Sequence, residues 1–453
     1  MDIGHWALGK RKIPPFPFPL SPFPFPLSPF PFPLSPSIFG LTEEQAIAII
    51  NTPLEQLEDA SDKYIAVSHL INFPTKQSIA ALIRAIETSN PAELDHRIVR
   101  RKAVESLGRL QAESALPVIR QCLKDDDIYT VENSVWAIGE IGTKDPEILE
   151  EVAQLLDKPG QIYRVIIHTL ARANYQPSLE RIRKFTVVED EPTRSAAIAT
   201  VCRFTGDYSQ ITEVIALLQS SNVNARRGCI QDLIDSRYYK AIPEIARCPV
   251  SLVFRLRGLR MLLNAGVPAG EITFAEVQPY LEQVLYDRPK DIDLVHEYDV
   301  TPVLNFVIEE LYQTDFGRCY LATKTLLDIY HQEAPAALLA TYADKAYNDY
   351  GAHYHVMKLL GWLKYIPAYD LLVENLHNRE PQFQKSRAAC ALALGELGNP
   401  KAIPELKICL NSQIWDLKYA CLLALDRLGD SSGREIAAQD TDWLIRAKAE
   451  SNN

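Results

Sequence analysis

The segment DKAYNDYGAHYHVMKLLGWLKY (344–365) has the densest mixture of aromatic and polar side chains in the sequence. Its rings could hold a flat, conjugated ligand, and packing between helices is the alternative role. A metal site is not expected, because His353 and His355 are two residues apart and would lie on different faces of a helix. The residues that we predict to contact a ligand here are Tyr350, His353, His355 and Trp362.

A second polar cluster lies in TDFGRCYLATK (314–324), where Asp315, Arg318 and Cys319 stand close to Gly317. A glycine lets a ligand approach the backbone closely. Cys319 has polar neighbours in the sequence, so a reactive thiol and a packing role both stay open.

A third segment, DIYTVENSVWAIGEIG (127–142), places Glu132 and Trp136 four residues apart, and such residues share one face of a helix. Signature motifs of the common catalytic classes are absent from the sequence: there is no HExxH, no Walker loop, no GxSxG and no GxGxxG after a strand. Any activity is therefore expected from a surface that the helices build together.

Those helices follow an internal period of about 31 residues. The stretches VESLGRLQAESALPVIRQCL (104–123) and LALGELGNPKAIPELKICL (392–410) share a Leu-Gly pair with a proline nine residues past the glycine. Each unit is typical of helix, short turn, helix, with the proline in the first turn of the second helix. We predict an all-α fold, a HEAT-like α-solenoid of roughly twelve helix pairs that forms a curved superhelix. Irregular spacing between 265 and 345 indicates a bend.

A column of basic residues recurs eight residues before the Leu-Gly position. Arg side chains bridge helix ends well, so we predict that this column is a structural ladder of hydrogen bonds. The column reads Arg100, Val131, Arg164, Arg194, Arg226, Arg257, His353, Arg387 and Lys418, with Val131 as an apolar exception.

Composition limits the partners. A net charge of -11 argues against a nucleic-acid partner, because neutralising phosphates needs a basic face. The eight cysteines include no CxxC pair, which indicates a reduced, cytoplasmic compartment, and Cys122, Cys390, Cys409 and Cys421 recur at repeat positions where they should pack. No apolar run is long enough to insert into a membrane.

The first forty residues differ from the repeats. Residues 15–35 are the unit PFPFPLS written in tandem, and prolines at alternate positions forbid a helix. We predict a disordered Pro/Phe-rich tail (1–40), N-terminal HEAT-like repeats (41–290), C-terminal HEAT-like repeats (291–440) and a C-terminal tail (441–453).

Several non-periodic segments carry a resemblance: YTVENSVWAIGEIG, SLVFRLRG, TDFGRCYLATKT and GAHYHVMKLLGWLK. From about Leu41 to Asp430 the chain resembles the HEAT-repeat phycobilin lyases of the E/F type, and within them the long, phycoerythrin-associated, CpeY-type members. The resemblance implies an enzyme that attaches phycoerythrobilin through a thioether to a cysteine of an apo-phycobiliprotein, the phycoerythrin α subunit. It implies a bilin substrate with no other cofactor, and it leaves room for a second HEAT-repeat lyase subunit.

For such a reaction we expect Asp315 and His353 to donate or relay a proton. Arg257 or Arg318 would pair with the bilin propionates, and Trp136 would stack on the bilin or pack. Two alternatives stay open for the whole chain. One is a lyase-isomerase that yields phycourobilin, and the other is a non-catalytic scaffold or chaperone for phycobiliprotein subunits.

Overall fold

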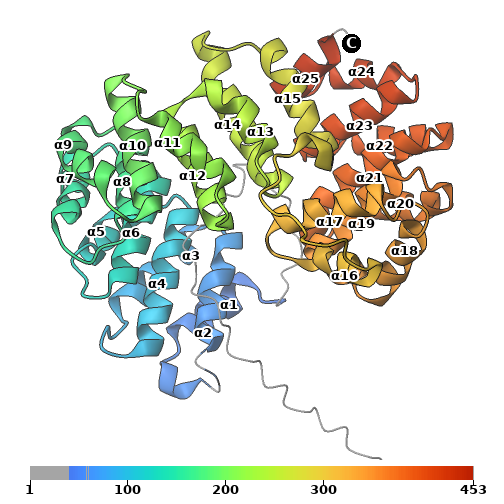
Figure 1. Ribbon diagram of the computed structural model, residues 1–453. Coiled ribbons are helices and arrows are strands. Elements are labelled where there is room, and N and C mark those ends of the chain that lie inside the picture. Colours follow the sequence, from blue (N-terminus) through green and yellow to red (C-terminus); the bar gives the residue numbers. More distant parts are fainter. Residues whose placement is uncertain (1–39, 58, 60, 452–453) are drawn as a thin grey trace, which may run out of the picture. The chain divides into compact units, whose positions relative to one another are not determined.

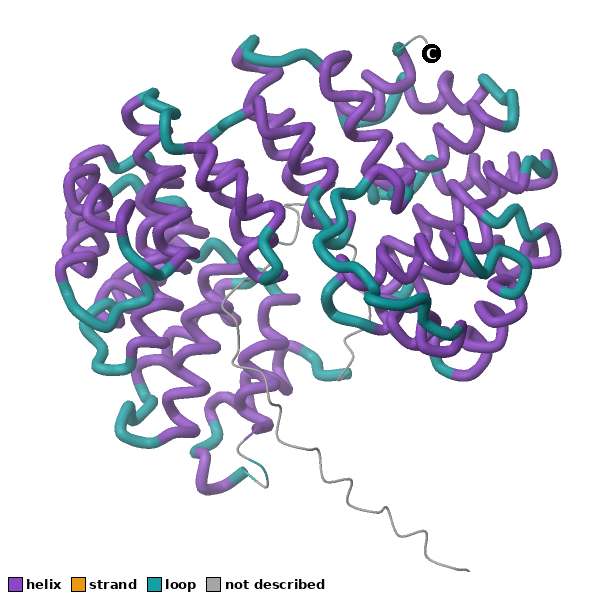
Figure 2. Tube along the Cα trace, viewed as in Figure 1, coloured by secondary structure: helices purple, strands orange, loops and turns teal. Residues whose placement is uncertain are grey.

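The computed structural model describes residues 40–57, 59 and 61–451, and the described residues from Leu41 onward form one compact unit. The predicted tail, 1–40, lies outside the described residues except for Gly40. The described part contains helices joined by turns and loops, without a strand (Figure 2), and no helix in it is long and apolar enough to cross a membrane. The all-α solenoid prediction is therefore confirmed.

The described residues form 25 α-helices, linked in places by single turns of 3₁₀ helix (Figure 1). Their bounds are α1 Glu43–Asn51, α2 Ser61–His69, α3 Lys76–Glu87, α4 Leu94–Arg109, α5 Leu116–Cys122, α6 Ile128–Ile141, α7 Pro146–Gln154, α8 Tyr163–Ala173, α9 Leu179–Arg183, α10 Glu191–Thr205, α11 Ile211–Ala216, α12 Val223–Ser236, α13 Ile242–Arg247, α14 Leu252–Ala269, α15 Phe274–Tyr286, α16 Leu304–Glu309, α17 Phe316–Asp328, α18 Ala334–Asp344, α19 Tyr350–Trp362, α20 Tyr369–Leu376, α21 Gln384–Leu397, α22 Ile403–Cys409, α23 Trp415–Arg427, α24 Ser432–Ala437 and α25 Trp443–Glu450.

The longer helices of successive repeats form a first row, in which α4, α6, α8, α10, α12 and α14 each pack against the next. Shorter helices such as α5, α7 and α9 form a second row beside α6, α8 and α10 (Figure 1). The recurring glycine explains the close approach within the first row. A Cβ atom on Gly361 would lie 2.5 Å from the Cα of Ala393, and one on Gly108 would lie 2.8 Å from the Cα of Ala137.

The basic column does form a structural ladder. Most of its guanidinium groups donate to carbonyl oxygens at the end of the preceding helix or turn, as Arg226 does to Ser220 at 2.6 Å and Arg387 to Leu376 at 2.8 Å. Such carbonyls have no partner within their own helix and need an outside donor. Arg164 instead donates to the Gly228 carbonyl oxygen and to Asp232. In the sixth repeat the member is Arg255, which donates to Ala246 at 3.1 Å, so the assignment of Arg257 to the column is wrong.

The irregular middle of the chain is a fold-back. Residues 292–303 contain no helix, and α14 and α15 contact the C-terminal repeats as well as their own neighbours. Glu282 of α15 accepts from Tyr419 at 3.2 Å and from Lys448 at 3.0 Å, and Arg260 of α14 pairs with Asp442 at 2.9 Å. These contacts place α14 and α15 against α23 and α25 (Figure 1).

Two of the predicted boundaries differ from the structure. Residues 441–453, predicted as a tail, contain α25, because Leu444 and Ile445 bury their side chains against the repeats. The apolar core forms two clusters, 46–201 and 198–445, which meet in α10 rather than near residue 290. All eight cysteines are buried and free, as predicted for the four that recur with the period.

Candidate functional site

The residues predicted from the sequence do not form one site. His353 is fully buried, where Nδ1 lies 2.9 Å from Ser386 Oγ and Nε2 lies 2.9 Å from Asn375 Oδ1, and its ring stacks on Phe383 at 4.2 Å. Burial lowers its pKa to about 4, against the opposing effect of the Asn375 hydrogen bond. A neutral ring is a weak acid, and both nitrogens of His353 are engaged by Ser386 and Asn375 in a fully buried position, so the predicted proton relay does not fit.

His355 and Trp362 also occupy packed positions. His355 is fully buried 4.8 Å from the Phe316 ring, and burial together with the charges of Lys358 and Lys385 holds its pKa well below the usual range. Trp362 lines a recess of only ≈ 10 Å³, room for about one water molecule. These positions fit the packing alternative better than ligand contact.

Tyr350 is the exposed member of the aromatic segment, with 49% of its surface accessible. The Nζ of Lys385 lies 3.3 Å from the centre of its ring, in a cation–π contact. Burial lowers the pKa of that lysine strongly.

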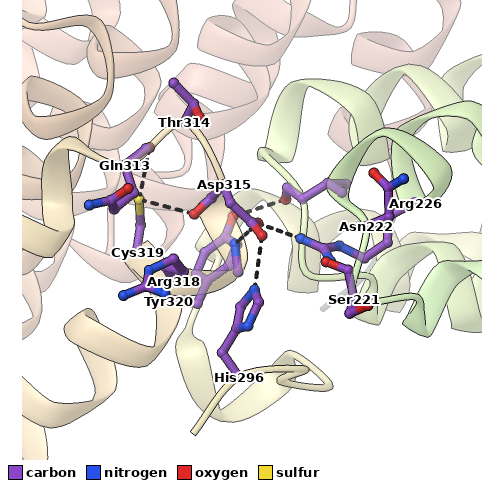
Figure 3. Close-up of polar contacts among 12 residues, drawn as sticks. Ser221, Asn222, Arg226, His296, Gln313, Thr314, Asp315, Arg318, Cys319 and Tyr320 are labelled. Carbon is purple, nitrogen blue, oxygen red and sulfur yellow. Dashed lines mark hydrogen bonds and ion pairs between the residues drawn. The ribbon is translucent and has the colours of Figure 1, made fainter. Parts of the chain in front are cut away.

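Asp315 joins two distant repeats. Its carboxylate accepts from the backbone N–H of Gly317 at 2.8 Å, which caps α17, and it pairs with Arg226 of α12 and with His296 Nε2 at 2.9 Å (Figure 3). Burial alone would raise its pKa, but the hydrogen bonds from Arg226 and His296 outweigh burial, so the pKa of Asp315 is lowered. A carboxylate whose pKa is lowered in this way stays ionised at neutral pH and is a poor proton donor, so the predicted catalytic role does not fit.

The remaining groups of that segment are also engaged. Arg318 pairs with Glu310 at 2.8 Å, and the Cys319 thiol lies 3.3 Å from the Gln313 carbonyl oxygen (Figure 3). Burial raises the pKa of Cys319 to about 12. Of the two roles that the sequence left open for Cys319, a reactive thiol and packing, the structure supports packing.

A different set of polar residues lies on α6, α8, α10 and α12, and we call this set the polar face. On α6 its residues are Glu132, Trp136 and Glu140, spaced by four, so they lie along one side of the helix. Glu140 pairs with Arg172 of α8. On α8, α10 and α12 a hydrogen-bonded network is formed by Arg164, His168, Ser195, Arg203, Asp232 and Asp235.

His168 is the centre of this network. Its Nδ1 lies 2.6 Å from Asp235 and its Nε2 lies 3.2 Å from Asp232, while Arg164 donates to Asp232 at 2.8 Å. Burial and the charge of Arg164 lower the pKa of His168, but the hydrogen bonds to the two aspartates outweigh them, so its pKa is raised. The network draws α8 and α12 together across α10, whose Ser195 donates to Asp232.

Glu132 is the least compensated group of the polar face. Its side chain is buried, and among the residues that the structure describes Oε1 has no hydrogen-bond partner. Burial raises its pKa to about 7, against the opposing charge of Arg101. A carboxyl group that titrates near neutral pH is suited to taking up and releasing a proton. Trp136 follows one turn later on the same helix.

A recess of ≈ 480 Å³ opens at the C-terminal end of the polar face, within the ~300–1,000 Å³ typical of small-molecule sites. We call it the basic recess, and it is lined by Lys144, Arg172, Asn174, Arg203, Tyr208, Ser236 and Arg237. The sequence prediction missed it, although its four cations recur at steps of 28, 31 and 34 residues.

Arg257 belongs to this neighbourhood. Burial lowers its pKa, Asp235 opposes that effect, and Arg172 and Glu140 also act on it. Arg257 is thus close to the polar face and the basic recess, while Arg318 is not. Of the predicted residues, Trp136 and Arg257 lie in this neighbourhood and the other six lie on the C-terminal repeats.

Comparison with known proteins identifies relatives of this chain. The chain is 60% identical to the phycocyanin operon protein Y of Pseudanabaena tenuis (strain PCC 7409), over 91% of this chain and 98% of that protein. It is 32% identical to the bilin biosynthesis protein CpeY of Synechococcus sp. (strain WH8020), over 86% of this chain and 97% of CpeY. The chain belongs to the HEAT-repeat bilin lyase family.

Two repeat models match parts of the sequence: HEAT repeats match residues 92–171, and the PBS lyase HEAT-like repeat matches residues 386–412. The phycocyanobilin lyase subunit alpha of Synechococcus elongatus is 29% identical over 49% of this chain and 86% of that protein. The solved complex of CpcE and CpcF from Nostoc sp. PCC7120 is more distant, with 24% identity and a TM-score of 0.48 over 57% of this chain.

Proposed function

We propose that this member of the bilin lyase family attaches phycoerythrobilin through a thioether to a cysteine of an apo-phycobiliprotein, the phycoerythrin α subunit. The observation that carries the proposal is the similarity to CpeY, which extends over 97% of that protein and over nearly the whole helical unit of this chain. A likeness limited to single repeats would indicate only a shared scaffold.

The reaction is an addition. The thiolate of the acceptor cysteine forms a C–S bond at the ethylidene carbon of bilin ring A, the C=C bond is lost, and a proton is added to the neighbouring ring carbon. Electrons balance without an oxidant or a reductant, and the proton lost by the thiol is replaced on carbon. The lyase therefore needs to supply a pose and a proton path, not a nucleophile, which agrees with the burial of all eight of its cysteines.

We propose that this reaction takes place at the polar face. Trp136 offers a ring on which a conjugated bilin can stack, and Glu132, with its raised pKa, is one helical turn away. Glu132 would receive the proton of the acceptor thiol and deliver a proton to ring A. Arg257 adds a positive charge at the other end of the face.

A second acceptor has support of its own. The relative that is 60% identical is named after a phycocyanin operon, which favours a phycocyanin subunit as the acceptor. A relative named as a lyase subunit alpha also favours a second lyase subunit as a partner.

Co-expression tests these proposals together. Cells that make phycoerythrobilin would express this chain with α or β subunits of phycoerythrin or phycocyanin, with and without a partner lyase subunit. Covalent pigment is read as zinc fluorescence after denaturing electrophoresis. Pigment above a no-lyase control on the phycoerythrin α subunit supports the proposal. Pigment on a phycocyanin subunit alone would show that phycocyanin, not phycoerythrin, is the acceptor. A phycourobilin spectrum would show that the chain is a lyase-isomerase. Control levels on every subunit leave the scaffold alternative.

A further inference from the structure

We propose that the basic recess is the subsite that binds the two propionate carboxylates of the bilin, an inference that rests on the proposed function. The recess brings Lys144, Arg172, Arg203 and Arg237 to one hollow in a chain whose net charge is -11. A bilin carries one propionate on each of its two middle rings, so a pair of neighbouring carboxylates is its most polar feature.

The charges of the recess are largely uncompensated. Arg172 pairs with Glu140, but among the described residues Lys144, Arg203 and Arg237 form no ion pair with a carboxylate. Arg203 donates one hydrogen bond, to the Asp235 carbonyl oxygen at 3.1 Å, and a guanidinium has five N–H donors. Burial and the charge of Arg237 lower the pKa of Arg203, and the charge of Asp235 opposes them. Four neighbouring cationic side chains with few carboxylate partners are suited to binding anions.

Helix capping is the competing explanation for these side chains. Lys144 donates to the Ala173 carbonyl oxygen at 3.1 Å, and cations in the last turn of a helix offset the partial negative charge of its end. Capping accounts for Lys144 and for one donor of Arg203. It does not account for Arg237, which has left-handed backbone at the end of α12 (φ 55°) and whose guanidinium has no hydrogen-bond partner among the described residues.

The position of the recess suits a bilin that reaches the polar face. Glu140, which pairs with Arg172 of the recess, is eight residues from Glu132, or about 12 Å along α6. With the propionates of the middle rings in the recess, ring A can extend past Trp136 toward Glu132. The subsite would thus fix which end of the bilin meets the proton-transfer group.

Binding of free bilins to the full chain tests the subsite without an acceptor protein. Absorbance titrations would use phycoerythrobilin and phycocyanobilin, each as the diacid and as the dimethyl ester. The variants are Arg203→Gln with Arg237→Gln, and Arg379→Gln as the matched control, because Arg379 is an exposed arginine in the loop after α20. We expect the double variant to bind the diacid about 10- to 100-fold more weakly, and Arg379→Gln to bind like wild type.

The ester separates charge pairing from shape. Wild type should lose a similar factor when the diacid is replaced by the ester, and the double variant should bind both forms alike. If wild type binds ester and diacid equally, the subsite is refuted even when ligation occurs in cells. If the diacid binds with the expected losses but no subunit is pigmented, the subsite stands and the lyase proposal fails. The ester experiment needs only wild type, so it decides the question even if the double variant does not fold.

Discussion

Replacing Glu132 by glutamine should make the chain more stable, and most of the gain should appear at alkaline pH. Burial raises the pKa of Glu132 from 4.5 to about 7, so the folded state holds this proton more tightly than the unfolded state. At 1.36 kcal/mol per pKa unit, that difference corresponds to about 3 kcal/mol. The associated stability is present below pH 4.5 and is lost as the pH rises through about 7.

Glutamine has nearly the same shape and never ionises, so Glu132→Gln should avoid this loss. Urea unfolding followed by circular dichroism would measure the free energy of unfolding of both proteins at pH 5 and pH 8. The variant should gain up to about 3 kcal/mol over wild type at pH 8 and much less at pH 5. In the co-expression assay the same variant should ligate poorly, because it cannot carry a proton. Equal stability differences at both pH values would refute the burial argument, and full ligation would refute the proton role.

Three further predictions concern packing and charge. Gly361→Ala should lower the free energy of unfolding in urea by ~1–3 kcal/mol, because the added Cβ would lie 2.5 Å from Ala393 Cα. The control is Gly351→Ala in the same helix, whose Cβ would meet its nearest atom at 3.6 Å and which should cost little. Equal losses in the two variants would contradict the close-packing explanation. Asp232→Asn should cost ~3–5 kcal/mol at neutral pH, because it removes the buried negative charge that faces Arg164 and leaves His168 with Asp235 as its one carboxylate partner. A thermal unfolding midpoint like that of wild type would show that the network is not stabilising. Cys319→Ala should keep ligation, since its thiol is buried with a pKa of about 12, and loss of pigment from a variant that still folds would give that thiol a chemical role.

The repeat could be predicted from the sequence because its causes are local. The proline after each Leu-Gly pair starts a helix. The glycine of the pair lets neighbouring helices approach closely, as Gly361 does against Ala393 of the next repeat. The ladder was predicted for the same reason. His353 looked like an exception with chemical meaning, yet it occupies the ladder position and bonds to Ser386 and Asn375 much as its arginine counterparts bond to carbonyls.

The site was harder to predict because it depends on register between repeats. Lys144, Arg172, Arg203 and Arg237 stand in four different repeats, each beside ordinary helix-ending residues, and only the stacking of helices brings them to one recess. The pKa of Glu132 depends on burial, which the residue type does not reveal.

The fold-back changes how this solenoid is expected to unfold. An open repeat array touches only its neighbours and can fray one repeat at a time from either end. Here the last repeat is fastened to the middle of the chain, through Lys448 with Glu282 and Arg260 with Asp442. Contacts between residues more than 160 positions apart must form late in folding and break early to release the C-terminal end. Residues 252–450 should therefore exchange their amide hydrogens as one cooperative block, while the repeats before α10 open step by step.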